Sequence, residues 1–146
     1  MNEPTYRVDF DSENDYYIFE SIGTNGIIHK VVAFNKMEEN LYNLGFGDYD
    51  LQSRTVNDTN VSDNGDMIKV LATVISIAVK FLSESPMIYI HVEGSNNIRT
   101  QLYQRIINRN YDYLIRSYKI YGLINGILEQ YEINKSYESF MIIKLL

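Results

Sequence analysis

Residues 91–105 read HVEGSNNIRTQLYQR, and their pattern sets what is expected on either side of them. The first part is the end of a strand, which Gly94 and Ser95 interrupt before a helix begins at Ser95 or Asn96. Proteins that combine strands and helices often place their chemistry at such junctions, because the first turn of a helix presents unpaired N–H groups and a positive dipole end. The segment therefore predicts the location of a site without predicting a reaction.

Upstream, residues 67–83 form the clearest predicted helix. Its apolar side chains recur at three- and four-residue spacing, which is the pattern of a helix with one buried face. These side chains are Met67, Val70, Leu71, Val74, Ile75, Ala78, Phe81 and Leu82. Asp66 or Asn64 is expected to cap the start of this helix, and Pro86 follows its end. Residues 87–92 then form a strand that leads into the junction.

Hairpins flank this central unit. Residues 16–22 and 27–34 are rich in β-branched and aromatic side chains, and an Asn-Gly pair predicts the turn between them. Residues 118–124 and 127–133 form a second hairpin around another Asn-Gly pair. The remaining expected elements are a strand at residues 6–10, a helix at residues 97–108 that buries Ile98, Leu102 and Ile106, a short helix at residues 111–117, and a last strand at residues 140–145.

Residues 38–66 differ from the rest, and we predict a long surface loop there. The polar run at residues 57–66 has too few apolar side chains to build core. The segment NLGFGD at residues 43–48 is expected to be a glycine-bearing part of this loop, with at most one short strand at residues 43–49. Loops of this length in compact domains are usually functional or mobile.

The order of elements is β-β-β-(loop)-α-β-α-β-β-β. It predicts a single α+β domain over residues 1–146, in which two main helices cover a twisted, mostly antiparallel sheet. The last strand, residues 140–145, is expected to form a sheet edge, and such an edge can pair with a second copy in a homodimer.

Composition excludes several classes of protein. The 146 residues are 45% hydrophobic, as expected of a folded domain, and they include two histidines and no cysteine, so we predict no disulfide and no metal site. A formal net charge of −6 argues against a DNA-binding protein. No uninterrupted apolar run suits a membrane span, and the start of the chain does not resemble a secretory signal, so we expect a bacterial, cytoplasmic protein without a membrane partner.

Two segments form the predicted binding edge, whose leading interpretation is a non-enzymatic binding or regulatory module without a cofactor. In the first segment, two glycines allow a ligand to approach closely; its candidates are Asn43, Gly45, Gly47 and Asp48. In the second, helix amides and a guanidinium suit an anion; its candidates are Gly94, Ser95, Asn96 and Arg99. A small anionic ligand or an acidic protein segment would fit, although the second segment is equally explained as a simple helix cap.

Two alternatives remain open. Tyr103 lies one turn after Arg99, and its phenol suits a general acid, while His91 and Glu93 share one face of a strand and suit a general base. These residues suit an enzyme that uses acid–base catalysis, but ordinary packing explains each of them as well. The other alternative is RNA binding through a basic patch, whose members are Arg99, Arg105, Arg109 and Arg116.

Several short motifs together resemble the signature of a small, uncharacterised bacterial family of unknown function. They are NLGFGD at residues 43–48, LATV at residues 71–74, Gly94-Ser95, Arg99 and Leu102-Tyr103. This resemblance covers most of the chain and implies a compact single domain, but it implies no activity.

Residues 66–146 also resemble, in the order of their elements, the second half of the GCN5-related N-acetyltransferases. The resemblance implies an acetyltransferase-like sheet and an N-acyltransferase that uses a coenzyme A thioester. In that family a tyrosine at the position of Tyr103 often serves as general acid, so the resemblance implies this role for Tyr103. The family holds the coenzyme A pyrophosphate with an Arg/Gln-x-x-Gly-x-Gly/Ala loop, whereas residues 60–66 here read NVSDNGD. Asp63 and Asp66 would repel a pyrophosphate, so the resemblance implies the fold more strongly than the cofactor.

Overall fold

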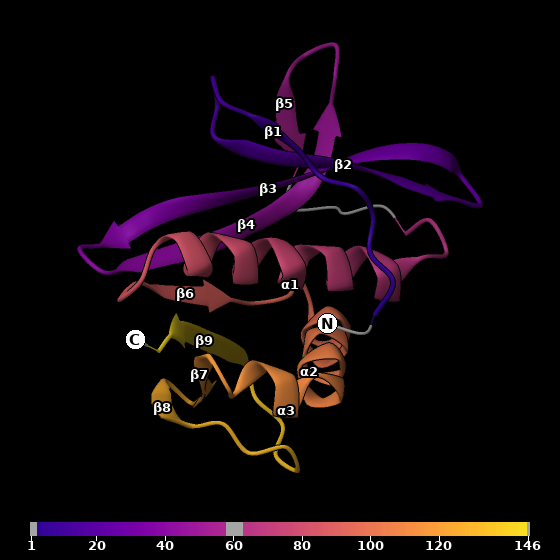
Figure 1. Cartoon of the computed structure of the whole chain (residues 1–146). Coiled ribbons are helices and arrows are strands. Elements are labelled where there is room, and N and C mark those ends of the chain that lie inside the picture. Colours follow the sequence, from indigo (N-terminus) through magenta and orange to yellow (C-terminus); the bar gives the residue numbers. More distant parts are fainter. Residues whose placement is uncertain (1–2, 58–62, 146) are drawn as a thin grey trace.

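The computed structural model describes residues 3–57 and 63–145, and it has the predicted α+β class. One nine-stranded, mostly antiparallel sheet runs in the order β1-β2-β3-β4-β6-β9-β7-β8, with β5 paired to β4 (Figure 1). The strands are β1 (Asp9–Asp11), β2 (Tyr16–Gly23), β3 (Gly26–Glu38), β4 (Leu41–Asp50), β5 (Thr55–Asn57), β6 (Tyr89–Val92), β7 (Tyr118–Ile124), β8 (Ile127–Gln130) and β9 (Ser139–Lys144). The helices are α1 (Met67–Glu84), α2 (Asn97–Arg109) and α3 (Tyr111–Leu114).

Both predicted hairpins are present. In the β7–β8 hairpin, Asn125 and Gly126 have φ angles of 54° and 74°, which is the backbone that a tight two-residue turn requires. In the β2–β3 hairpin, Gly23 faces Gly26 across the turn, so the turn begins one residue earlier than the Asn-Gly pair suggested.

The predicted loop at residues 38–66 is wrong over its first half, because β4 is a ten-residue strand inside the sheet. Leu44 is buried and lies opposite Phe34, and Phe46 lies opposite Val32, so both side chains pack with the core. Gly45 and Gly47 alternate with them along the strand. Taken alone, these glycines are typical of a loop. Here they leave two neighbouring positions on the opposite face of β4 without side chains. Of the polar run, residues 58–62 lie outside the described residues.

The last strand is also misplaced in the sequence prediction. β9 lies between β6 and β7 and pairs with both, so it is not a sheet edge. Phe140 and Ile142 are buried in the core, and this burial accounts for the apolar character that suggested an exposed, self-pairing strand. The homodimer route through residues 140–145 is therefore wrong, whereas dimerisation through another surface stays a prediction.

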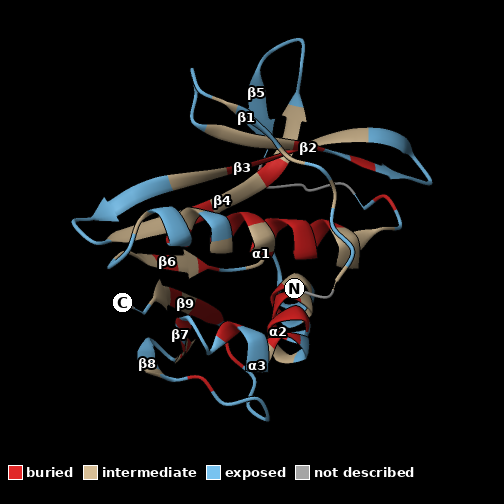
Figure 2. Cartoon of the chain, viewed as in Figure 1, coloured by how far each residue is buried: buried red, intermediate tan, exposed pale blue. Residues whose placement is uncertain are grey.

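Helix α1 lies against the sheet and supplies much of the core (Figure 2). Of its predicted buried face, Val70, Leu71, Val74, Ile75, Ala78 and Leu82 are almost inaccessible to solvent, and Met67 and Phe81 are partly buried against the core. The predicted stripe of α2 is wrong at Ile98, which is 70% exposed, because the face of α2 that packs on α1 carries Tyr103, Ile106 and Ile107. Within the described residues, no helix is long and apolar enough to cross a membrane.

Candidate functional site

A gap opens in the sheet where β4 and β6 separate. The two strands run parallel but pair over three residues each, residues 41–43 against residues 89–91. β6 then ends at Val92 and the chain turns into α2, whereas β4 continues to Asp50 beside β3. The separation leaves a cleft of about 150 Å³ between β4 and the β6–α2 junction.

This cleft brings together most of the residues that the sequence analysis selected. β4 contributes Asn43, Leu44, Gly45 and Phe46, and the junction and α2 contribute Glu93, Gly94, Ser95, Arg99 and Tyr103. Leu71 of α1 completes the lining. Leu44, Phe46 and Leu71 form its apolar part and were missed as site residues. Leu71 belongs to the predicted buried face of α1, and Leu44 and Phe46 lie in a segment that was predicted to be a loop.

The junction itself is built around Gly94. Its backbone N–H donates a hydrogen bond to Thr100 Oγ1 over 3.0 Å, and a Cβ atom at this position would lie 2.4 Å from the Thr100 nitrogen. The strand can therefore approach the first turn of α2 this closely because it carries a glycine here. Asn96 caps the helix, since its Oδ1 accepts a hydrogen bond from the Arg99 N–H over 2.9 Å. Asn96 thus has the helix-cap role and does not line the cleft.

The guanidinium group of Arg99 supplies the positive charge of the cleft. Its Nη1 donates a hydrogen bond to Ser95 Oγ over 2.7 Å, which holds the guanidinium across the junction. Tyr103, one turn further along α2, is 2% exposed. Burial raises the pKa of the Tyr103 phenol, and the Arg99 guanidinium opposes this shift. The phenol therefore keeps its proton more tightly than an ordinary tyrosine, and its predicted role as a general acid stays a prediction.

His91 has a different partner from the one that the sequence suggested. Its Nδ1 lies 2.9 Å from Asn43 Oδ1 on the neighbouring strand. Burial lowers the pKa of His91, and the Glu93 carboxylate opposes this shift. An uncharged ring whose Nδ1–H donates to Asn43 keeps a lone pair on Nε2, so the geometry suits a neutral acceptor beside the cleft.

We expect the free energy of unfolding to depend on pH through His91. Because burial holds the folded-state pKa below the unfolded value of about 6.5, folding favours the uncharged ring. The resulting stabilisation is complete above that unfolded value and is lost as the pH falls through the folded pKa. Urea unfolding between pH 7.5 and pH 5 would measure the loss, and His91→Gln is expected to show less of it than the unsubstituted protein.

His29→Gln is the matched control for this experiment, since His29 lies beside Glu20 on the β2–β3 pair, away from the cleft. It is expected to follow the unsubstituted protein. An equal acid loss in His91→Gln and in the unsubstituted protein would contradict the assignment. An NMR titration of the His91 ring, with a midpoint below 6.5, would support it directly.

Two of the predicted ligand-binding residues lie on β4 but outside the cleft. Gly47 is buried in the sheet. The carboxylate of Asp48 accepts a hydrogen bond over 2.5 Å from the ammonium of Lys30, which is 1% exposed. Asp48 therefore compensates a buried charge, and a carboxylate in that role is costly to withdraw toward a ligand.

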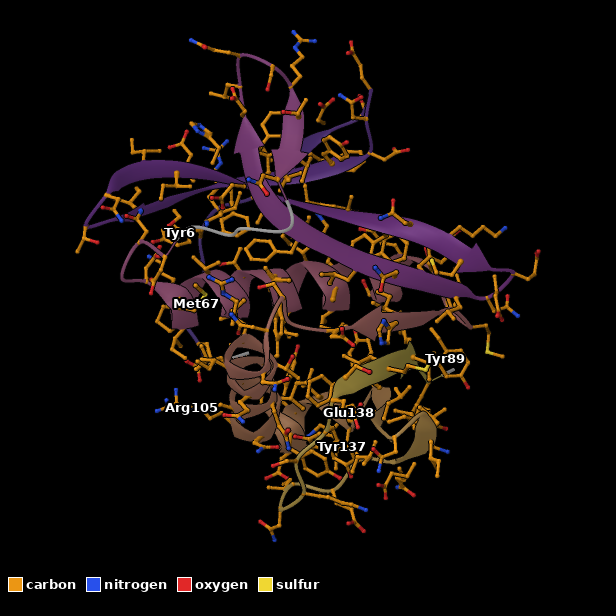
Figure 3. All side chains as sticks on the ribbon, turned by 180° about the vertical axis from the view of Figure 1, so that it is seen from behind. Tyr6, Met67, Tyr89, Arg105, Tyr137 and Glu138 are labelled. Carbon is orange, nitrogen blue, oxygen red and sulfur yellow. The ribbon has the colours of Figure 1, made fainter. Side chains whose placement is uncertain are left out.

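The arginines of the predicted RNA-binding patch have separate surroundings. Arg99 is turned toward the cleft, and Arg109 lies 3.4 Å from the Glu3 carboxylate in an ion pair. Arg105 projects from α2 into solvent (Figure 3). Because Arg109 is paired with Glu3 and Arg99 lines the cleft, the four arginines do not share one setting, and RNA binding stays a prediction.

The start of α1 holds a carboxylate where the acetyltransferase resemblance would place a pyrophosphate. Asp66 occupies the N-cap position, but its side chain makes no capping hydrogen bond to the helix. Instead its Oδ2 accepts hydrogen bonds from the hydroxyl groups of Tyr6 and Ser21, over 2.5 and 2.6 Å. The prediction that the Asp66 side chain caps α1 is therefore wrong. Its hydrogen bonds instead connect the N-terminal segment and β2 to the start of α1. Residues 60–62 of the corresponding loop lie outside the described residues.

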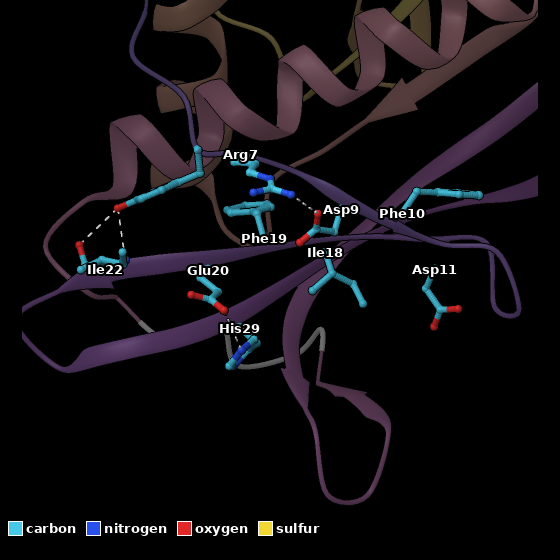
Figure 4. A pocket seen from close by; sticks show the side chains of 10 residues that line it. Arg7, Asp9, Phe10, Asp11, Ile18, Phe19, Glu20, Ile22 and His29 are labelled. Carbon is cyan, nitrogen blue, oxygen red and sulfur yellow. Dashed lines mark hydrogen bonds and ion pairs between the residues drawn. The ribbon is translucent and has the colours of Figure 1, made fainter.

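A larger hollow of about 520 Å³ lies between the N-terminal segment and β2 (Figure 4). Most of its charged side chains are paired with one another, Arg7 with Asp9 at 3.6 Å and His29 with Glu20 at 3.5 Å, and Asp11 accepts hydrogen bonds from Glu13 and Asn14 in the adjoining turn. Such pairing leaves little reason to recruit a charged ligand, and the sequence analysis selected none of its residues. Within the described residues, no group of three or more His, Asp or Glu side chains is arranged to hold a metal ion.

Comparison with known proteins assigns the chain without assigning an activity. A family model described as a family of unknown function (DUF6934) matches residues 2–145, nearly the whole chain. No curated protein matches the chain, and no solved structure matches it. A function therefore has to be argued from the cleft between β4 and β6.

Proposed function

We propose that this chain, which belongs to the DUF6934 family, is a binding protein whose cleft between β4 and β6 takes a small carboxylate ligand. One observation carries the proposal. Two segments selected for anion binding and close backbone approach, residues 43–48 and 94–103, lie more than 40 positions apart in sequence and meet in this cleft.

The lining of the cleft supplies what such a ligand needs. Arg99 and Ser95 stand at the first turn of α2, where a guanidinium, a hydroxyl and the positive end of a helix favour an anion. On the other side Phe46 offers a partly exposed apolar surface, behind which Leu44 and Leu71 are buried. Polar groups that fix a ligand beside an apolar surface are typical of small-molecule sites.

Size and charge narrow the ligand further. About 150 Å³ is well below the roughly 300–1,000 Å³ of pockets for drug-sized molecules, so a small metabolite fits better than an acidic protein segment. Glu93 also lines the cleft. Its carboxylate would repel a pyrophosphate, so the site favours a ligand with a single negative charge.

The acyltransferase alternative is favoured by one observation, the position of Tyr103 in the lining of the cleft. A general acid has to release its proton during the reaction, whereas burial raises the pKa of this phenol. The same hydroxyl group is well suited to donate a hydrogen bond to a bound carboxylate. The geometry therefore supports binding more than acyl transfer.

An NMR titration tests the proposal. A panel of small carboxylic acids, with and without an amino group, would be added to ¹⁵N-labelled protein at pH 7, with acetyl coenzyme A and a short RNA as separate arms. We expect saturable shifts at the amides of Gly45, Gly94 and Ser95 with at least one carboxylic acid. No saturable shift with any of the acids at millimolar concentration would contradict the proposal, and so would saturation with acetyl coenzyme A or RNA alone.

A further inference from the structure

We infer that the ligand of this cleft is a zwitterion, a small α-amino acid with its carboxylate toward Arg99 and its ammonium toward Glu93. The inference rests on the proposed function, since it names the ligand class for the same site. It follows from the two ionised side chains in the lining, which have opposite signs and come from different elements, Glu93 from the end of β6 and Arg99 from α2.

The two charges lie on different elements of the cleft. The Glu93 carboxylate opposes the lowering of the His91 pKa by burial, and the Arg99 guanidinium opposes the raising of the Tyr103 pKa by burial. The His91 ring bonds to Asn43 of β4, whereas Tyr103 lies on α2 together with Arg99. The cleft therefore has a negative end after β6 and a positive end on α2.

A ligand with a single charge can pair with only one of the two ionised side chains, Glu93 or Arg99. A simple carboxylate gains from Arg99 but lies in the field of Glu93, and a simple amine has the reverse problem. An α-amino acid has both charges within a few ångströms of each other and complements both ends. Because burial lowers the pKa of His91, the ring beside Glu93 is uncharged at neutral pH and adds no cation that would repel the ammonium group.

The rest of the lining selects the side chain. The exposed part of Phe46, backed by the buried Leu44 and Leu71, is an apolar surface that favours a small apolar side chain over a charged one. Gly45 and Gly94 keep the cleft walls free of side-chain atoms beside the ligand backbone. Alanine, valine and similar neutral amino acids are therefore the class that fits.

Isothermal titration with alanine and three analogues tests the inference. Propionate lacks the ammonium group, ethylamine lacks the carboxylate, and alaninamide has its carboxylate replaced by an uncharged amide. We expect alanine to bind at least roughly tenfold more tightly than propionate, the size expected of one charge-assisted contact, and the other two to bind more weakly still. Equal binding of alanine and propionate would overturn the inference and leave the proposed function in place.

Substitution of Glu93 gives an independent readout. In Glu93→Gln the preference for alanine over propionate should fall to within about twofold, while propionate binds at least as well as before, because the repelling carboxylate is gone. Glu39→Gln, at an exposed carboxylate in the β3–β4 turn, is the matched control and should keep the full preference. An unchanged preference in Glu93→Gln would overturn the inference, and a failure of every carboxylate to bind would overturn the proposed function as well.

Discussion

Replacing Gly122 with alanine should destabilise the folded protein by about 3 kcal/mol, the upper end of what overpacking a core costs. Gly122 lies in β7, directly beneath the ring of Tyr137. A Cβ atom there would stand 2.1, 2.3 and 2.4 Å from three atoms of that ring, far inside van der Waals contact. The methyl group and the ring cannot occupy this space together.

The ring of Tyr137 has no easy way to move aside. Its backbone N–H donates a hydrogen bond to Gln104 Oε1, and its hydroxyl group accepts one from the Glu132 N–H. The ring also packs between Tyr131 and Phe140, with centroids 5.3 and 6.3 Å away. Figure 3 shows Tyr137 on the segment that passes below α2, so its displacement would loosen the contact between that segment and the helix.

Urea unfolding would measure this effect. Gly45→Ala is the matched control, because its Cβ atom would lie 3.4 Å from the nearest side-chain atom, and we expect it to stay within about 1 kcal/mol of the unsubstituted protein. In a Tyr137→Ala background, Gly122→Ala should cost much less, since the clash is absent. A loss below about 1 kcal/mol in the native background, or an equal loss in both backgrounds, would contradict the steric argument.

The sequence predicted the helices and turns that are determined by residues close to one another along the chain. α1 follows from its apolar spacing, and the β7–β8 turn follows from the chemistry of Asn125 and Gly126. β4 was missed because Gly45 and Gly47 are typical of loops in isolation. They fit a strand only because β3 and β6 lie on either side of it, and that neighbourhood is a property of the whole sheet.

In the candidate site, too, features that depend on nearby residues were predicted, and features that depend on strand pairing were not. The cap by Asn96 and the turn at Gly94 depend on neighbours within six positions, and the sequence pattern predicted both. The contact between His91 and Asn43 joins residues 48 positions apart, and it arises from a strand pairing that no local pattern encodes. The sequence therefore indicated which segments to consider, and the parallel pairing of β4 and β6 determines that they share one cleft.

Replacing Arg99 with alanine should weaken carboxylate binding at least roughly tenfold, because a hydrogen bond from a charged donor contributes about 1.5–3 kcal/mol. Arg99 is half-buried and lies outside the hydrophobic core, so its removal should cost much less free energy of unfolding than Gly122→Ala. Titration calorimetry and urea unfolding would measure the two effects, with Arg105→Ala as the control that removes an exposed charge from the same helix. Binding that survives in Arg99→Ala would contradict the site. A large loss of stability would instead make Arg99 a structural residue, since its charge would then be serving the fold of the junction rather than a ligand.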